Sequence, residues 1–165
     1  MTKKEFKKWA LEQVRILDGA TGTQLQKAGM PIGVCPEKWV LQNPETLIKI
    51  QQKYIESGSE IIYTCTLGGN GLKLKESGVE GAYRINRELA ALSKKAAGSR
   101  AYVAGDIAPT GQLMEPFGMY TFEEIVDVYK EQVKGLLDGG VDLFVIETMM
   151  DIQEARAALL AVKET

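Results

Sequence analysis

Residues 141–148 read Val-Asp-Leu-Phe-Val-Ile-Glu-Thr, an apolar run that ends abruptly in an acidic and a hydroxyl residue. The run is rich in β-branched and aromatic residues and is too short for a helix, so it predicts a buried strand. Three similar runs precede it, at residues 14–17, 60–64 and 100–104, with helical patterns in the gaps between them. Continuous apolar strands that alternate with helices are typical of a parallel sheet covered by helices. The sequence therefore predicts an α/β fold.

The helices of this pattern begin at recognisable capping signals. Asn43-Pro44-Glu45 predicts an N-cap followed by proline at the first helical position. Residues 121–124 (Thr-Phe-Glu-Glu) and 151–154 (Asp-Ile-Gln-Glu) have the spacing of a capping box. Residues 1–13 predict a further amphipathic helix, laid across one end of the sheet. Because no linker or low-complexity stretch interrupts the sequence, residues 1–165 are expected to form one domain.

Composition excludes several classes of function. The 165 residues include 20 Lys+Arg and 22 Asp+Glu, a net charge of −2, which gives no basic field for binding nucleic acid. No apolar run approaches the roughly 18 residues of a membrane span, and the first residues lack the apolar core of a secretory signal. Two cysteines without a disulfide framework fit a reducing compartment, so a cytoplasmic protein is expected. There is no histidine, which excludes Ser-His-Asp and Cys-His catalysis and any histidine metal ligand in this chain.

Small, polar and acidic residues follow all four predicted strands. Ligands of parallel α/β folds bind at the carboxyl ends of the strands, so these segments are expected to surround one polar ligand. Asp18 and Glu147 each lie one step past a strand, where they are placed to receive a cationic group such as an ammonium. Glycines in the turn after Asp18 let backbone N–H groups approach a ligand and receive a carboxylate. A pocket with both features suits a free amino acid.

Other interpretations of these residues stay open. Aspartate and threonine after strands are common helix caps, and glycines there often serve only the turn. Residues 19–23 also form a weak phosphate cradle, although they lack the P-loop Lys-Ser/Thr pair and the Rossmann glycine spacing. Cys65 follows a strand as a candidate ligand or nucleophile, but its spacing of 30 from Cys35 is not a metal signature. The N-terminal helix is a candidate membrane-surface helix, although Phe6 and Trp9 as anchors of a solvated helix explain it equally well.

Five segments, taken together, resemble the homocysteine-binding methyltransferase domain. That domain is the amino-terminal module of cobalamin-dependent methionine synthase and occurs in betaine–homocysteine and related S-methyltransferases. The segments are Ile-Leu-Asp-Gly-Ala-Thr-Gly-Thr at 16–23, Asn-Pro-Glu at 43–45, Thr-Cys-Thr-Leu-Gly-Gly-Asn at 64–70, Pro-Thr-Gly at 109–111 and Asp-Leu-Phe-Val-Ile-Glu-Thr at 142–148. The family usually has asparagine where Cys65 stands and phenylalanine where Leu67 stands, so the loop that carries them is expected to be reshaped.

The resemblance implies a (β/α)8 TIM barrel that binds homocysteine at its top and transfers a methyl group to the homocysteine sulfur. The residues that it places around homocysteine are Asp18, Gly19, Ala20, Thr21 and Glu147 at the amino-acid end and, along the same pocket, Thr64, Thr66 and Asn70. A complete barrel needs about 250 residues, whereas this chain supplies four β-α units, so residues 1–165 correspond to the first half of a barrel. The family's zinc ligands are three cysteines of the second half, so no metal ligand is expected here. Zinc is implied as a cofactor of the complete domain, and methylcobalamin is one candidate methyl donor.

Three functional hypotheses follow. The favoured one is the first half of a homocysteine S-methyltransferase domain of methionine biosynthesis, inactive until a second barrel half or a second copy of the chain completes it. The second is a non-catalytic module that binds an amino acid or associates with another half barrel. The third is a flavodoxin-like domain that binds a phosphate-containing ligand at the first turn.

Overall fold

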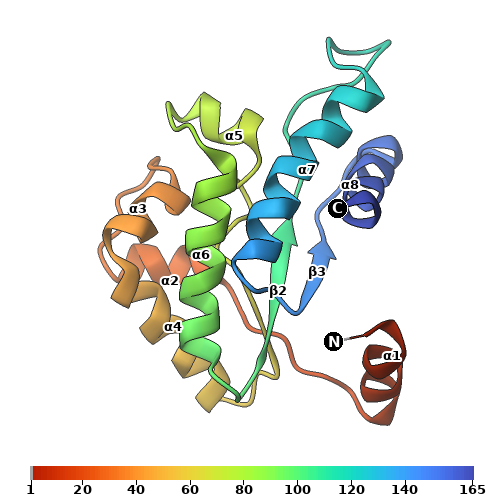
Figure 1. Cartoon of the computed structure of the whole chain (residues 1–165). Coiled ribbons are helices and arrows are strands. Elements are labelled where there is room, and N and C mark those ends of the chain that lie inside the picture. Colours follow the sequence, from red (N-terminus) through yellow and green to blue (C-terminus); the bar gives the residue numbers. More distant parts are fainter. Residues whose placement is uncertain (1) are drawn as a thin grey trace.

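A three-stranded parallel sheet forms the centre of the computed structural model, which describes residues 2–165. The strands lie in the order β1 (Ile61–Tyr63), β2 (Tyr102–Ile107) and β3 (Leu143–Ile146) (Figure 1). These are three of the four predicted strands, and the prediction of an α/β fold with a parallel sheet is confirmed.

The expected strand at residues 14–17 is reduced to a single contact. Leu17 forms one parallel bridge with Ile61 at the outer edge of β1, and the Asp18 N–H donates to the Ile61 carbonyl at 3.0 Å. Ile16 is 53% exposed, because this segment has a neighbouring strand on one side only. The prediction of a buried strand here is therefore wrong, although the segment has the expected place beside β1.

Eight helices accompany the sheet within residues 2–165. They are α1 (Lys3–Glu12), α2 (Thr21–Lys27), α3 (Pro36–Gln42), α4 (Pro44–Glu56), α5 (Gly71–Glu76), α6 (Ala82–Ala97), α7 (Phe122–Asp138) and α8 (Ile152–Glu164). Helix α4 begins with Pro44 after Asn43, and α7 begins after Thr121 with both hydrogen bonds of a capping box, as the sequence predicts. None of the helices in this part of the chain combines the length and apolarity needed to cross a bilayer.

Helix α8 begins where predicted but is capped differently. The Asp151 side chain accepts a hydrogen bond from the Gln153 N–H at 2.7 Å, whereas Glu154 does not complete a capping box. Glu154 is buried, and its Oε1 accepts hydrogen bonds from the Thr110 N–H at 2.7 Å, the Thr110 hydroxyl at 2.6 Å and the Tyr129 hydroxyl at 3.0 Å. Glu154 thus ties α8 to α7 and to the loop after β2.

The helices that connect the strands form one layer. Helices α4, α6, α7 and α8 lie in a row along the sheet, each packed against the next (Figure 1). The strands follow one another in chain order, with Leu17 on the outer side of β1. A flavodoxin-like sheet instead has the order 2-1-3-4, with helices on both faces. The hypothesis of a flavodoxin-like domain is therefore wrong in its fold.

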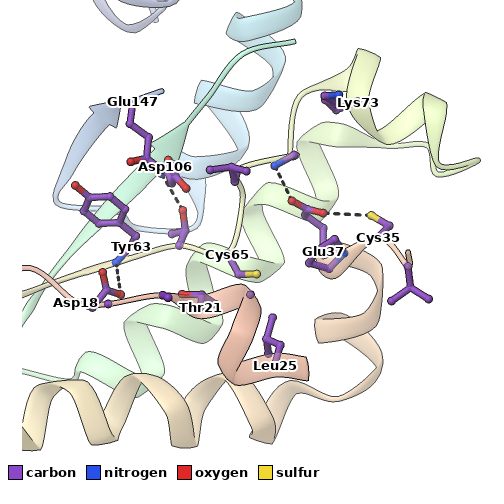
Figure 2. Close-up of a pocket in the computed structure, with 18 of the residues that line it drawn as sticks. Asp18, Thr21, Leu25, Cys35, Glu37, Tyr63, Cys65, Lys73, Asp106 and Glu147 are labelled. Carbon is purple, nitrogen blue, oxygen red and sulfur yellow. Dashed lines mark hydrogen bonds between the residues drawn. The ribbon is translucent and has the colours of Figure 1, made fainter. Parts of the chain in front are cut away.

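Strand residues alternate between a helix-covered face and an open face. Ile62 and Val103 belong to the apolar cluster under the helices. Tyr63 is one residue from Ile62, and Asp106 is three residues from Val103, so both side chains lie on the opposite face of the sheet. The Glu147 side chain, which follows β3, reaches the same face (Figure 2). The polar residues at the strand ends thus gather on the open face.

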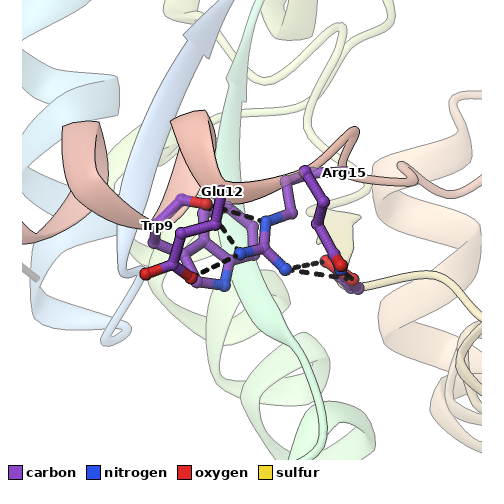
Figure 3. A network of polar contacts seen from close by, with 5 residues as sticks. Trp9, Glu12 and Arg15 are labelled. Atoms are coloured by element: carbon purple, nitrogen blue, oxygen red, sulfur yellow. Dashed lines mark hydrogen bonds and ion pairs between the residues drawn. The ribbon is translucent and has the colours of Figure 1, made fainter.

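One arginine attaches α1 at the amino-terminal end of the strands. The Arg15 guanidinium donates to the Trp9 carbonyl at 2.6 and 3.0 Å and pairs with Glu12 at 3.2 Å and Glu60 at 3.0 Å (Figure 3). It also lies 4.1 Å above the Trp9 ring, which meets the Tyr102 ring edge-on at 5.1 Å. Because α1 itself has no buried residue, its position depends on this cluster.

Arg15→Ala should release α1 from the sheet. The substitution removes a cation–π contact and several charged hydrogen bonds, so it should lower the free energy of unfolding by about 1–3 kcal/mol. Amide hydrogen exchange measured by mass spectrometry should become fast across residues 3–12 while the three strands stay protected. Lys7→Ala on the same helix is the matched control. Unchanged protection of α1 in the arginine variant would contradict this account.

Candidate functional site

A cavity of about 780 Å³ opens at the carboxyl ends of the strands (Figure 2). Its walls come from the first turn and α2, from the loop that leads into α3, from the loop after β1 and from the ends of β2 and β3. The lining combines apolar side chains with carboxylates, and the residues that matter most for ligand chemistry are Leu17, Leu25, Val34, Leu67, Asp18, Glu37, Asp106 and Glu147.

Most of the binding residues that the sequence predicts line this cavity. They are Asp18, Gly19, Ala20, Thr21, Thr64 and Glu147. Thr66 and Asn70 lie behind the wall instead, and both are fully buried. The Asn70 side chain accepts a hydrogen bond from the Lys73 N–H at 3.0 Å, so this residue caps α5.

Two threonines after β1 hold the end of β2 through a closed ring of hydrogen bonds. The Asp106 N–H donates to Thr64 Oγ1 at 3.0 Å, and the Thr66 hydroxyl donates to the Asp106 carbonyl at 2.8 Å. Since the single hydroxyl proton of Thr66 is used there, Thr64 must donate in the 2.6 Å contact between the two hydroxyl oxygens. Both threonines are buried, so the ring is shielded from water and fixes the backbone of Asp106.

Asp106 is the main site residue that the sequence analysis missed. It lines the cavity, is 4% exposed, and its Oδ1 has no hydrogen-bond partner among the described residues. Its carboxylate lies beside that of Glu147, close to the Tyr63 ring (Figure 2). The pattern that predicts Asp18, an acidic residue directly after an apolar run, could also have predicted Asp106. The predicted strand stopped at residue 104, however, whereas β2 continues to Ile107.

Burial makes Asp18 and Asp106 weaker acids than an exposed aspartate. Desolvation, followed by repulsion from Glu147 and Asp18, raises the pKa of Asp106 to about 8. Desolvation also raises the pKa of Asp18 to about 6, although a hydrogen bond from the Tyr63 N–H opposes this shift. The pKa of the Tyr63 phenol is raised by desolvation and by the same carboxylates. Because every one of these shifts disfavours further negative charge, a cationic ligand would be stabilised here.

The turn after Asp18 presents backbone donors to the cavity. Asp18 Oδ2 accepts a hydrogen bond from the Tyr63 N–H at 3.0 Å, which ties the turn to β1. Helix α2 begins at Thr21, and its N-cap, Ala20, provides no side-chain hydrogen bond. The first N–H groups of a helix have no partner within the helix. Donors suited to an anion therefore lie within a few residues of a carboxylate suited to a cation.

A second buried carboxylate, Glu37 of α3, joins two walls of the cavity. Its Oε1 accepts a hydrogen bond from the Gly68 N–H at 2.7 Å, and its Oε2 accepts one from the Cys35 thiol at 3.2 Å. A Cβ at Gly68 would lie 3.0 Å from Glu37 Oε1, so glycine permits this close approach. Glu37 was not predicted as a site residue, because the Gly68 N–H that joins it to the second wall belongs to the backbone 31 residues away.

The two thiols of the cavity wall do not form a metal site with these carboxylates. Burial raises the pKa of both Cys35 and Cys65, which keeps them as thiols at neutral pH, whereas a metal binds the thiolate. No three His, Cys, Asp or Glu side chains within residues 2–165 are grouped so that they could hold a metal ion. The residues present therefore do not fit a zinc centre.

Comparisons with known proteins agree with one another. Residues 15–165 match the family model described as homocysteine S-methyltransferase. Methionine synthases of Mycobacterium tuberculosis and Mycobacterium leprae are 32% and 29% identical to this chain over 162 residues, an alignment that covers 90% of this chain and 14% and 13% of theirs. The metallated and oxidized forms of the homocysteine methyltransferase MmuM from Escherichia coli have TM-scores of 0.80 and 0.79 at 20% identity, covering 96% and 92% of this chain and 62% and 58% of theirs. The chain thus spans about a seventh of the curated relatives and about three fifths of the solved structures, which share its fold.

The stability of the fold should fall as the pH rises from about 4 to about 8. The pKa of Asp106 is raised from 3.8 to about 8, so between these values the folded chain retains a proton that the unfolded chain has lost. This stabilisation is complete below pH 3.8 and lost by about pH 8, at up to about 1.4 kcal/mol per pH unit. Asp18 adds the same trend up to about pH 6.

Urea unfolding at a series of pH values measures this slope. Asp106→Asn should flatten its upper part, between about pH 6 and 8, because an amide does not ionise. Asp127→Asn, at an exposed position of α7, is the control. Identical slopes in the Asp106 variant and the unsubstituted chain would rule out Asp106 as the source.

Proposed function

Because the chain belongs to the homocysteine S-methyltransferase family, we propose that it binds homocysteine in the cavity at the carboxyl ends of its strands. One observation carries the proposal: the carboxylates of Asp18 and Glu147 and the uncapped start of α2 share this cavity. These groups are what an α-ammonium and an α-carboxylate require. The α-ammonium and the α-carboxylate of an amino acid are attached to the same carbon. A site for both must therefore hold acidic side chains and N–H donors close together.

In the proposed complex each end of the ligand has its own partners. Asp18 and Glu147 accept hydrogen bonds from the ammonium group. Backbone N–H groups at Gly19, Ala20 and Thr21 donate to the carboxylate. The side chain of homocysteine then extends along the apolar part of the lining, with its thiol directed away from the first turn.

We further propose that residues 1–165 are the first half of a (β/α)8 barrel. The chain-order sheet and the single layer of helices support this, since a barrel repeats both features around a closed ring. Residues 143–146 of β3 are only partly buried, although they are all apolar. A second barrel half, or a second copy of this chain, would pair with the open edge of β3 and cover the open face.

Methyl transfer needs more than this cavity. The thiolate is the nucleophile, and a thiol with a pKa near 8.5 is only a few per cent ionised at neutral pH. In the complete domain a zinc ion would deprotonate the thiol that it binds. The described residues offer no set of ligands for that zinc ion. We therefore propose that this chain binds and orients homocysteine and is a poor methyltransferase alone. Methylcobalamin stays the candidate methyl donor for the complete domain. We propose a cytoplasmic location, because both cysteines are free thiols, as is usual in a reducing compartment.

A non-catalytic amino-acid-binding module is the second candidate. It is favoured by the absence of a metal-ligand group within residues 2–165, because binding needs only the carboxylates and the backbone donors. The two candidates share one cavity. They differ in whether a completing half restores methyl transfer.

Isothermal titration calorimetry should detect binding of L-homocysteine by the purified chain. Asp18→Asn and Glu147→Gln should each weaken it by about 10- to 100-fold, since a hydrogen bond to a charged group is worth about 1.5–3 kcal/mol. Asp127→Asn is the control for a lost surface charge.

The contrary outcomes of this titration are specific. A nucleotide that binds where homocysteine does not would favour a phosphate site. Homocysteine affinity that both variants retain would reject the assignment of Asp18 and Glu147. Tight, stoichiometric zinc in the purified chain would contradict the proposal that its metal ligands lie elsewhere.

The open face of the sheet should make the chain associate with itself. Val145 pairs in register with Asp106 and so belongs to the open face, where Val145→Lys places a charge. Sedimentation velocity should show dimers or larger species that this variant reduces. Leu159→Lys, at an exposed position of α8, is the matched control. A strictly monomeric unsubstituted chain at micromolar concentration would argue against an uncovered half barrel.

A further inference from the structure

The fold makes no use of the Asp106 side chain. The backbone of this residue is held by the ring with Thr64 and Thr66, and Gln132 Nε2 lies a further 3.3 Å from its carbonyl oxygen. Its carboxylate, by contrast, makes no hydrogen bond among the described residues, and Oδ1 is buried without a partner. A buried carboxyl group without partners destabilises a fold. Its place on the cavity wall therefore points to a ligand.

The groups around this carboxylate supply no counter-charge. Those that face it are Asp18 of the first turn, Tyr63 and Cys65 of the segment after β1, Glu37 of α3 and Glu147 after β3. Lys73 of α5 also lines the cavity, but it pairs with Glu76 at 3.3 Å. A cation that neutralises this cluster must therefore come from the ligand.

We infer that Asp106 is a third acceptor for the ligand's ammonium group, beside Asp18 and Glu147, and that it selects for an unsubstituted ammonium. This inference rests on the proposed function, because the ammonium is that of homocysteine. A primary ammonium has three N–H donors, and each needs an acceptor once water is excluded. The three carboxylates come from three separate segments of the cavity wall, namely the first turn, the end of β2 and the residues after β3. A methylated nitrogen would lack a donor for one of them.

Binding is then linked to the loss of a proton. With a pKa of about 8, the Asp106 carboxyl is protonated at pH 7 in the empty cavity. An ammonium within hydrogen-bond distance stabilises the carboxylate and lowers that pKa, so the proton leaves to the buffer. The affinity for homocysteine should consequently rise as the pH approaches 8.

Calorimetry at pH 7 in two buffers of different ionisation enthalpy measures affinity and proton release together. The unsubstituted chain should release close to one proton per L-homocysteine bound. Asp106→Asn should bind about 10- to 100-fold more weakly and release none. 4-Mercaptobutyrate, which lacks the ammonium, should bind no more weakly to this variant than to the unsubstituted chain. L-Methionine, which has no thiol proton, should release the same proton as homocysteine does.

The outcomes separate this inference from the proposed function. Equal homocysteine affinity in Asp106→Asn, or a matching loss for 4-mercaptobutyrate, overturns the inference and leaves homocysteine binding in place. No binding of homocysteine to the unsubstituted chain overturns both. Should the variant fail to fold, the unsubstituted chain decides, because homocysteine binding without proton release at pH 7 contradicts a role for Asp106. Asp127→Asn should behave as the unsubstituted chain in every titration.

Discussion

The ring of hydrogen bonds among Thr64, Thr66 and the backbone of Asp106 is the constraint on which the site depends. Its three bonds are 2.6, 2.8 and 3.0 Å long and lie in the buried interior, where water does not compete for their protons and lone pairs. The ring locks the end of β1 to the end of β2. It therefore sets the position of Asp106 on the open face, beside Glu147. The buried threonines act by placing another residue, whereas Asp18 and Glu147 face the cavity themselves.

The layout of the sheet explains why acidic groups gather at one place. Because the strands follow one another in chain order and one layer of helices covers them, the opposite face is left for the first turn and the strand ends. The first turn, the end of β2 and the residues after β3 each bring a carboxyl group to this face, and repulsion from Glu147 and Asp18 adds to the cost of burying Asp106. Such a cluster is stable only when protons or a bound cation offset its charge.

Local signals in the sequence predicted much of the fold. Proline at 44 and the capping box at Thr121 place α4 and α7 correctly, because caps involve residues only a few positions apart. Asp18 and Glu147 were found because each directly follows an apolar run. Asp106 was missed because the predicted strand stopped at residue 104, whereas β2 continues to Ile107. Glu37 was missed because the Gly68 N–H that it accepts from belongs to the backbone 31 residues away. The segment at 14–17 has the composition of a strand, but composition does not reveal how many neighbours a strand will have.

The buried carboxylate of Glu154 has a practical consequence for protein engineering. In sequence, Glu154 reads as a solvated residue in the first turn of a helix, where a redesigned surface would freely accept lysine or alanine. In the fold it is the shared acceptor for the Thr110 backbone, the Thr110 hydroxyl and the Tyr129 hydroxyl. Consensus design or charge optimisation that replaced Glu154 would remove the hydrogen bonds that hold α8 against α7. Any library built on this scaffold should hold Glu154 constant.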